Sequence, residues 1–329
     1  PFAMGQFQPG GVVRVFDQGG AIWPVQTRPL ATWEDGTIKW LLVTAKAPAY
    51  AKGRQLWLEY GERVGADPAP EVRVTVDETP EEVTVTTGPL RLTVSKRRFT
   101  LFESAAIDRN HDGVFDAPER LAGGGDLVVG HRDTEFRSSQ DTQTYELEIE
   151  EAGPLRVTLK ATGWFRDAGG KGFCRFVLRL QAFAGLAQVR AYHTLIYTGY
   201  PANLFYFEYE GLRLPDNETI QEVSLELPVT VAANASVITA DHLAALSTPL
   251  DAPTTISQET HNAYRILKDD VSMRDGTQNE GWMLVQNGDG GVLAGVRDAW
   301  QQYPKALVAD PKTSRLMIKL WPQSAGEPN

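Results

Sequence analysis

Short runs of β-branched and aromatic residues, bounded by glycine, proline and aspartate, recur along almost the whole chain and constrain its fold more than any other feature. Only two short stretches, 241–246 and 298–303, offer even a brief helix pattern. So many strands at this spacing predict an all-β fold, a barrel or sandwich with mostly antiparallel pairing. The predicted strands are 12–16, 37–45, 55–60, 71–77, 82–86, 90–95, 143–150, 155–164, 173–183, 188–198, 204–209, 221–229, 264–267, 282–286, 291–296 and 315–320.

Two proline-containing stretches mark the best candidate domain boundary. Residues 65–70 are rich in proline, and Asp77–Pro80 follows shortly after. Such residues punctuate regular structure, so we place the boundary near residue 80. Residues 1–80 are then long enough for a small β-barrel domain, and residues 81–329 for a large antiparallel β-sandwich.

Charge and apolar content exclude several functional classes. The formal net charge is −10 and the one basic cluster is Lys96–Arg98, so duplex nucleic acid is a poor partner. No apolar run approaches the roughly 18 residues of a membrane-spanning helix. The chain begins at Pro1 without a signal-peptide pattern, which indicates a mature or trimmed form and leaves a removed signal peptide open. Asn217 and Asn234 begin glycosylation sequons, which matter only if the source organism uses that pathway.

The single cysteine, Cys174, excludes an intramolecular disulfide. It lies in the strand-like run 173–180, where alternate positions are apolar. A buried structural thiol is therefore favoured over a reactive nucleophile.

A twelve-residue segment, Asp108–Glu119, has the oxygen spacing of an EF-hand-type calcium loop. Gly113 stands at loop position 6, where the backbone must turn sharply. Four carboxylates so close together repel one another unless a cation is present. The competing interpretation is an Asx-rich surface turn without a metal. The expected ligands are Asp108, Asn110, Asp112, the carbonyl of Val114, Asp116 and Glu119.

The flanks of this loop favour a structural calcium ion over a sensor. The entering segment, 92–102, alternates like a strand, and the exit allows one helical turn before Gly123–Gly125. Without a helix on each side there is no helix pair to open on calcium binding. We expect the ion to fix a long inter-strand loop in an extracellular, calcium-replete setting.

Several aromatic motifs stand out as more than generic. The first, 20–28 with 31–43, contains an Asp35–Gly36 hairpin signal, and the second is 183–199, folded back at Gly185. The segments 300–305 and 318–322 complete the set. Together these motifs resemble the exo-rhamnogalacturonan lyase family of polysaccharide lyases. The resemblance implies a small N-terminal RIFT-type barrel, then a central β-sandwich and a C-terminal α/α toroid. The sequence ends at Asn329, where the toroid would begin. The sequence does not distinguish between a cut piece of a longer protein, a mature fragment and a natural relative without the toroid.

The resemblance also implies lyase chemistry, in which a base removes the proton beside a uronate carboxylate while a cation or arginine neutralises that carboxylate. We assign candidate catalytic roles to His193, Tyr197 and Lys305, and candidate substrate contacts to Arg190, Tyr192, Arg132 and Tyr303.

Each of these assignments has a structural alternative. Strand alternation places His193 and Tyr197 on one face and Arg190 and Tyr192 on the other, so His193 has apolar neighbours and a hydrogen-bonded core histidine is the alternative. For Tyr303 and Lys305, an exposed structural turn around Pro304 is favoured over substrate contact. Arg132 belongs to an expected loop after the glycine-rich segment 123–130. The tryptophans at positions 23, 33 and 40 suit sugar stacking or, preferentially, the core.

Two functions follow. The first is the β-rich portion of a secreted, periplasmic or cell-surface polysaccharide-processing protein with a structural calcium ion. The second is a non-catalytic carbohydrate-binding module, or an extracellular surface-layer or filament subunit, on the same scaffold. The expected partner is a polysaccharide or oligosaccharide, with homo-oligomeric assembly also open.

Overall fold

The computed structural model describes residues 1–47, 53, 55–61, 64–65, 68–121, 123–199, 220–288 and 290–323. Across these residues the regular structure is β-strand, apart from two 3-10 turns, η2 (Ala117–Glu119) and η3 (Ser138–Gln140). The predicted all-β, antiparallel fold is confirmed. The two short helices considered at 241–246 and 298–303 are turns and the strand β19 instead. The predicted strand at 204–209 and the sequon at Asn217 lie outside the described residues.

The N-terminal region is a small two-sheet unit. One sheet has the order β2-β1-β5 and the other is the hairpin β3-β4. The predicted turn at Asp35–Gly36 joins β3 and β4, and Gly36 has a φ of 83°, which suits glycine. Trp23 is buried, but Trp40 is 48 % exposed, so its preferred core assignment was wrong; the pleat turns its side chain outward. The strands are β1 (Val13–Asp17), β2 (Ile22–Trp23), β3 (Val25–Thr32), β4 (Ile38–Ala45) and β5 (Leu56–Tyr60).

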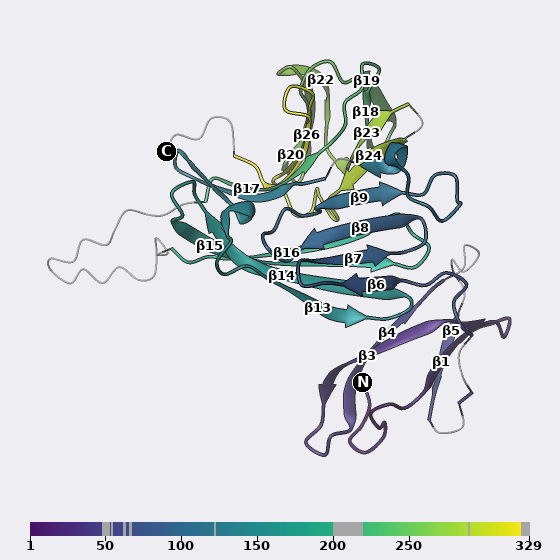
Figure 1. The fold of residues 1–329 in the computed structure, drawn as a ribbon. Coiled ribbons are helices and arrows are strands. Elements are labelled where there is room, and N and C mark those ends of the chain that lie inside the picture. The colour runs from purple at the N-terminus through teal and green to yellow at the C-terminus, as the bar shows by residue number, and fades with distance from the viewer. Residues whose placement is uncertain are drawn as a thin grey trace, which may run out of the picture.

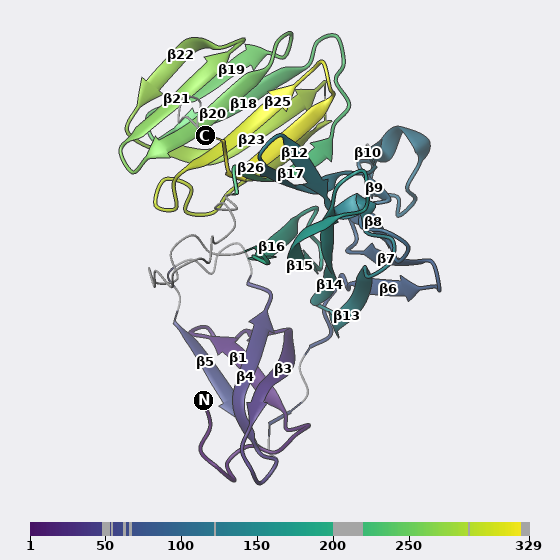
Figure 2. The same ribbon diagram turned by 90° about the vertical axis from the view of Figure 1, so that its left-hand side faces the viewer.

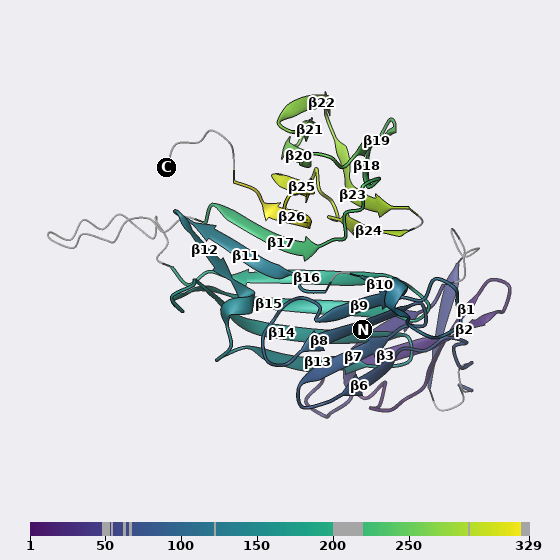
Figure 3. The same ribbon diagram turned by 45° about the horizontal axis from the view of Figure 1, so that its top comes forward.

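The next region is a β-sandwich. Its first sheet has the order β10-β9-β8-β7-β6 and packs against strands β11 to β17 of a much longer sheet (Figures 1 and 3). Phe99, Phe165 and Phe176 lie at the centre of the core, with ring centroids about 5.5 Å apart. The first sheet comprises β6 (Thr75–Glu78), β7 (Glu82–Thr86), β8 (Leu90–Ser95), β9 (Ser104–Ile107) and β10 (Arg120–Leu121). The facing strands are β11 (Asp126–His131), β12 (Thr134–Arg137), β13 (Glu146–Ala152), β14 (Arg156–Arg166), β15 (Gly172–Phe183), β16 (Val189–Ile196) and β17 (Glu222–Pro228).

A second sandwich follows on the same long sheet. The four-stranded sheet β19-β18-β23-β24 packs over the far end of the twelve-stranded sheet, around Ile256, Tyr264 and Met283 (Figure 2). Leu227 and Ile318 contact both hydrophobic cores, so β17 and β26 form the seam between them. These strands are β18 (Ser236–Asp241), β19 (Ala245–Pro249), β20 (Thr254–Thr260), β21 (Ala263–Lys268), β22 (Val271–Gly276), β23 (Asn279–Asn287), β24 (Gly290–Gly295), β25 (Lys305–Asp310) and β26 (Arg315–Trp321).

The glycine-rich segment 123–130, which precedes the expected loop at Arg132, leads into a buried strand. Residues from Asp126 onward form β11, which pairs with β12 on one edge and β17 on the other. Leu127 and Val129 are fully buried, and burial of these side chains outweighs the weak strand propensity of glycine. A side chain at Gly130 would stand 3.2 Å from Glu222, so glycine lets the two strands approach.

Two further sequence features can be located. Cys174 is buried in β15, in agreement with the expected structural thiol.

β6 precedes the proposed boundary at residue 80, yet it pairs with β7 in the first sheet of the sandwich. Among the described helical segments, none has the length and apolar character needed to cross a membrane.

Candidate functional site

The outer faces of β14, β15 and β16 form an exposed surface that carries two of the predicted substrate contacts. Tyr192 lies opposite Arg179, and Arg190 lies opposite Gln181, so all four side chains share the face turned away from the core. The predicted alternation of β16 is observed, because Leu195 packs against the core while Tyr192 is 49 % exposed. Figure 3 shows these strands side by side.

Two arginines on this surface lie beside aromatic rings. The Arg175 guanidinium lies 5.7 Å from the ring centroid of Trp164, and that of Arg190 lies 5.1 Å from the ring of Phe183. Within the described residues neither takes part in an ion pair, whereas their neighbour Arg179 donates to Glu150 at 2.8 and 2.9 Å. A guanidinium beside a ring keeps its N–H donors available for an anion.

His193 lies on the opposite side of β16, facing inward. It pairs with Leu178, and its ring meets the ring of Phe165 edge to face at 6.1 Å. Burial lowers the pKa of His193 to about 4, because the charged imidazolium loses hydration there. Its Nε2 atom has no hydrogen-bond partner among the residues that the structure describes. The position agrees with the core alternative for this residue, without the expected hydrogen bond to Nε2.

Tyr197 and Arg132 lie at the same end of the first sandwich. The ring of Phe173 stacks on His131 at 4.6 Å and meets Tyr197 at 6.1 Å, and Arg132 directly follows His131 in the tight turn between β11 and β12. Arg132 is exposed and has a φ of 53°. Arg137, at the end of β12, donates to Glu226 and Glu135.

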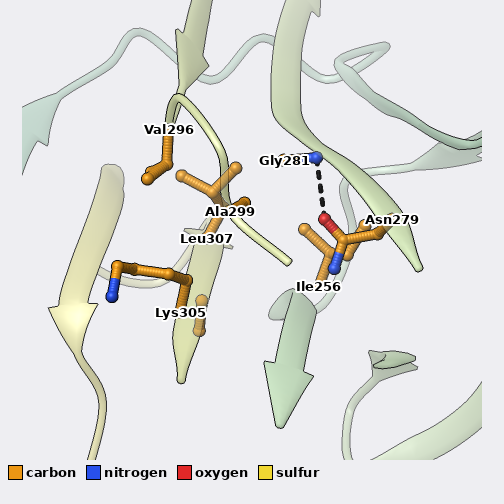
Figure 4. Close-up of a pocket in the computed structure, with 8 residues that line it drawn as sticks. Ile256, Asn279, Gly281, Val296, Ala299, Lys305 and Leu307 are labelled. Carbon is orange, nitrogen blue, oxygen red and sulfur yellow. Dashed lines mark hydrogen bonds between the residues drawn. The ribbon is translucent and has the colours of Figure 1, made fainter. Parts of the chain in front are cut away.

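Tyr303 and Lys305 belong to the second sandwich. Tyr303 is 44 % exposed, and its ring lies 6.1 Å from that of His261. Lys305 begins β25, and its Nζ atom donates to the carbonyls of Gln302 and Pro304. Burial lowers the pKa of Lys305. Figure 4 shows Lys305 at a small pocket with Ile256 and Asn279. The described contacts of Lys305 are therefore separate from those of His193.

The acidic loop Asp108–Glu119 folds around its own backbone. Oδ1 and Oδ2 of Asp108 accept the N–H groups of Asp112 and Gly113 at 3.2 and 2.9 Å. The buried Glu119 accepts N–H groups from Arg109 at 2.7 Å and Asp116 at 3.2 Å. Gly113 has a φ of 79°, as the sharp turn requires. In the described parts of the chain, no three carboxylate, imidazole or thiol side chains converge as a metal-binding cluster.

The arginine-aromatic surface was found only in part from the sequence. Arg190 and Tyr192 were singled out, but Arg175 and Trp164 were missed. Their only sequence signal is alternation within long strands, and the register that aligns three strands is set by tertiary pairing.

Comparison with known proteins places the chain in a family. Residues 1–57 match the family model of the PcRGLX-like N-terminal RIFT barrel domain, and residues 74–207 match that of the PcRGLX-like protein central beta sandwich domain. The uncharacterized protein YetA of Bacillus subtilis (strain 168) is 24% identical over 204 residues, which cover 59% of this chain. The matched region spans about a fifth of YetA (22%). Because the two family models follow each other in order and together cover more than half of the sequence, the chain belongs to the PcRGLX-like, exo-rhamnogalacturonan lyase-like family.

Proposed function

We propose that this chain is the β-rich portion of a secreted, periplasmic or cell-surface protein that processes an acidic, uronate-containing polysaccharide. The observation that carries the proposal is the exposed surface of β14 to β16. It combines Arg175 and Arg190 with Trp164 and Tyr192, and the family is carbohydrate-related.

This surface has the chemistry that an acidic sugar chain needs. A guanidinium donates two parallel hydrogen bonds to a carboxylate, and an aromatic ring covers the apolar face of a sugar. The chain has a net charge of −10, which disfavours a polyanion at long range. Two arginines that have no carboxylate partner among the described residues offset that repulsion locally.

In a lyase reaction, these arginines would neutralise the uronate carboxylate while a base removes the neighbouring proton. Of the three candidate catalytic residues, Tyr197 is the most exposed, at 37 %. His193 would have to act from the core side of β16, and Lys305 from another sandwich.

A second function, a non-catalytic carbohydrate-binding module, is favoured by the position of His193. A buried imidazole with a lowered pKa is a poor general base for a substrate on the opposite face of its strand. In this case the same surface holds the polymer, and no bond is broken.

One experiment separates the two functions. Rhamnogalacturonan, pectin and ulvan are each incubated with the folded protein, while ultraviolet absorbance records unsaturated products and affinity electrophoresis records binding. Binding with product formation supports the lyase function, and binding without it supports the module. If none of the three polymers binds at low salt, the proposal for this surface is wrong.

We also propose that Asp108–Glu119 binds Ca²⁺ as a structural ion. The donor set fits a hard cation, because it consists of carboxylate, amide and carbonyl oxygens. The side chains of Asp108, Asn110, Asp112, Asp116 and Glu119 and the carbonyl of Val114 would hold the ion. Arg109 of the same loop lies against Gly290 of β24, so an ordered loop also supports the contact between the two sandwiches.

A further inference from the structure

A second pocket lies in the part of the chain that neither family model covers. It has a volume of about 240 Å³ and opens at one end of the four-stranded sheet. Three separate parts of the chain build it: the β18–β19 turn, Gln278 with the first residues of β23, and the connection from β24 to β25. The lining residues are His242, Gln278, Asn279, Glu280, Asp298, Ala299, Trp300 and Gln301.

Hydrogen bonds hold the frame of this pocket in place. The buried Gln258 accepts both the backbone N–H and the side-chain amide of Asn279, at 3.0 and 2.9 Å. The same glutamine donates to the carbonyls of Thr260 and Thr277. Asn279 in turn accepts the N–H of Gly281 at 2.7 Å, as Figure 4 shows from the adjoining small pocket. The floor is therefore fixed before any ligand arrives.

The other two sides are also fixed. Asp241 accepts the N–H groups of Leu243 and Ala244, both at 2.8 Å, which sets the turn that carries His242. On the third side, the N–H of Val296 donates to Gly281 at 2.7 Å, and the N–H of Gln302 donates to Asp298 at 2.9 Å. The turn that carries Trp300 is therefore closed by backbone hydrogen bonds at both ends.

The lining selects for a particular kind of ligand. Glu280 and Asp298 are hydrogen-bond acceptors that match hydroxyl donors, while the amides of Gln278 and Gln301 match either donor or acceptor. Trp300, which is half-buried, supplies an apolar surface. The described lining residues include no lysine or arginine. Arg297 pairs with Asp298 at 3.4 Å, but its side chain is 90 % exposed. Two carboxylates disfavour an anionic ligand.

We propose that this pocket binds a neutral sugar unit, distinct from the acidic units assigned to the surface of β14 to β16. The choice of a carbohydrate rests on the proposed function, whereas the choice of a neutral one rests on the lining. Together the two sites would hold a polymer that contains both kinds of unit.

The test uses tryptophan indole signals in two-dimensional NMR of the isotopically labelled chain. Eight tryptophans give eight indole signals, and Trp300→Phe identifies the one that belongs to Trp300. Neutral methyl glycosides of rhamnose, galactose and glucose are titrated separately, with galacturonic acid at the same pH as the acidic probe. We expect at least one neutral glycoside to shift the Trp300 signal saturably, and galacturonate to leave it in place.

Matched variants complete the experiment. Glu280→Gln and Asp298→Asn should each weaken neutral-glycoside binding by roughly tenfold, the equivalent of one good hydrogen bond to a charged group. Gln302→Ala, at an exposed position of the same segment but outside the lining, should leave binding unchanged. A Trp300 signal that no neutral glycoside moves, or that galacturonate moves equally, overturns the proposal. If the unmodified chain binds a neutral glycoside at Trp300 but binds no acidic polymer, the proposed function is contradicted and the pocket proposal stands.

Discussion

The two sandwiches share one twelve-stranded sheet, yet their candidate binding surfaces have opposite charge. The first presents Arg175 and Arg190 on the outer face of neighbouring strands, and the second presents Glu280 and Asp298 in a pocket built from two turns and a strand end. The sheet face suits an extended polymer whose charge is spread along it. The pocket suits a single unit whose hydroxyls must each find a partner. The difference shows that a continuous sheet fixes neither the shape nor the charge of the sites at its ends.

The supporting structures are more alike than the surfaces. Each sandwich has a buried aspartate at a turn, and hydrogen bonds outweigh burial in lowering the pKa of each to about 2. Asp141 accepts from Thr144 and Arg166, and Asp241 accepts from Tyr264. Carboxylates held this way stabilise the fold above pH 4 and lose that contribution as the pH falls toward 2.

The largest expected effect comes from Gly281→Ala, which tests whether the pocket depends on its frame. Gly281 has a φ of 69°, and an added Cβ would stand 2.5 Å from the Cβ of Ala299 and 2.8 Å from the carbonyl of Val296. Strain and overpacking together should cost about 3 kcal/mol of unfolding free energy. Urea unfolding measures the loss, and neutral-glycoside binding should fall with it while polymer binding at the arginine surface persists.

Gly288→Ala is the matched control, because it lies at the end of the same strand with a φ of 55° and no atom near an added Cβ. It should cost only about 1 kcal/mol. Equal losses for the two variants would show that contact with the Ala299 turn contributes nothing.

The sequence predicted the locally determined parts of the fold but not the pocket around Gly281. The alternating run 173–183 and the Asp35–Gly36 hairpin were predicted, because local patterns determine them. The pocket was not predicted, since His242 and Asp298 come from two turns and Glu280 from the start of β23, and tertiary pairing brings them together. Its one sequence signal was the segment 300–305, which was interpreted through Tyr303 and Lys305 rather than Trp300. The division of residues 81–329 into two cores likewise depends on long-range register.

The next effect concerns the arginine surface. Arg175→Ala with Arg190→Ala should weaken binding of an acidic polysaccharide by about tenfold at low salt, roughly 1.4 kcal/mol. The loss should shrink as salt rises, because exposed charges are screened. Affinity electrophoresis at several salt concentrations measures it.

Arg97→Ala with Arg98→Ala removes the same charge from an exposed turn after β8 and serves as the control. An equal loss in the control would mean that net charge, and not this surface, governs binding. Neutral-glycoside binding in the pocket should not change in either double variant.

A smaller effect concerns His193, whose role divides the lyase from the binding module. The folded-state pKa is about 4, below the ordinary value of 6.5. The unfolded chain therefore binds the proton first, so stability contributed by neutral His193 is lost as the pH falls from about 6.5 to 4. His193→Leu should flatten the stability profile over that range and leave polymer binding intact. A variant with an unchanged profile but lost product formation would favour catalysis.

The smallest expected effect is that of calcium, which tests whether one loop supports both sandwiches. Extracellular calcium modules bind with dissociation constants of roughly 10⁻⁴ to 10⁻³ M, so 1 mM calcium should add only about 1 kcal/mol. For a chain of this size that corresponds to a rise in melting temperature of roughly 2 °C. Differential scanning calorimetry with chelator, calcium or magnesium measures it, and magnesium should have little effect.

Asp112→Asn keeps an oxygen acceptor for the N–H of Val114 but removes one ligand charge, so it should abolish the response to calcium. Asp133→Asn makes the same charge change in the exposed turn between β11 and β12 and should leave the response intact. Calcium should slow hydrogen exchange in β9, which precedes the loop. Because Arg109 lies against Gly290, it should slow exchange in β24 too. Protection confined to β9 would mean that the loop stabilises the first sandwich alone. An unchanged melting temperature would mean that Asp108–Glu119 is a hydrogen-bonded turn that does not bind calcium.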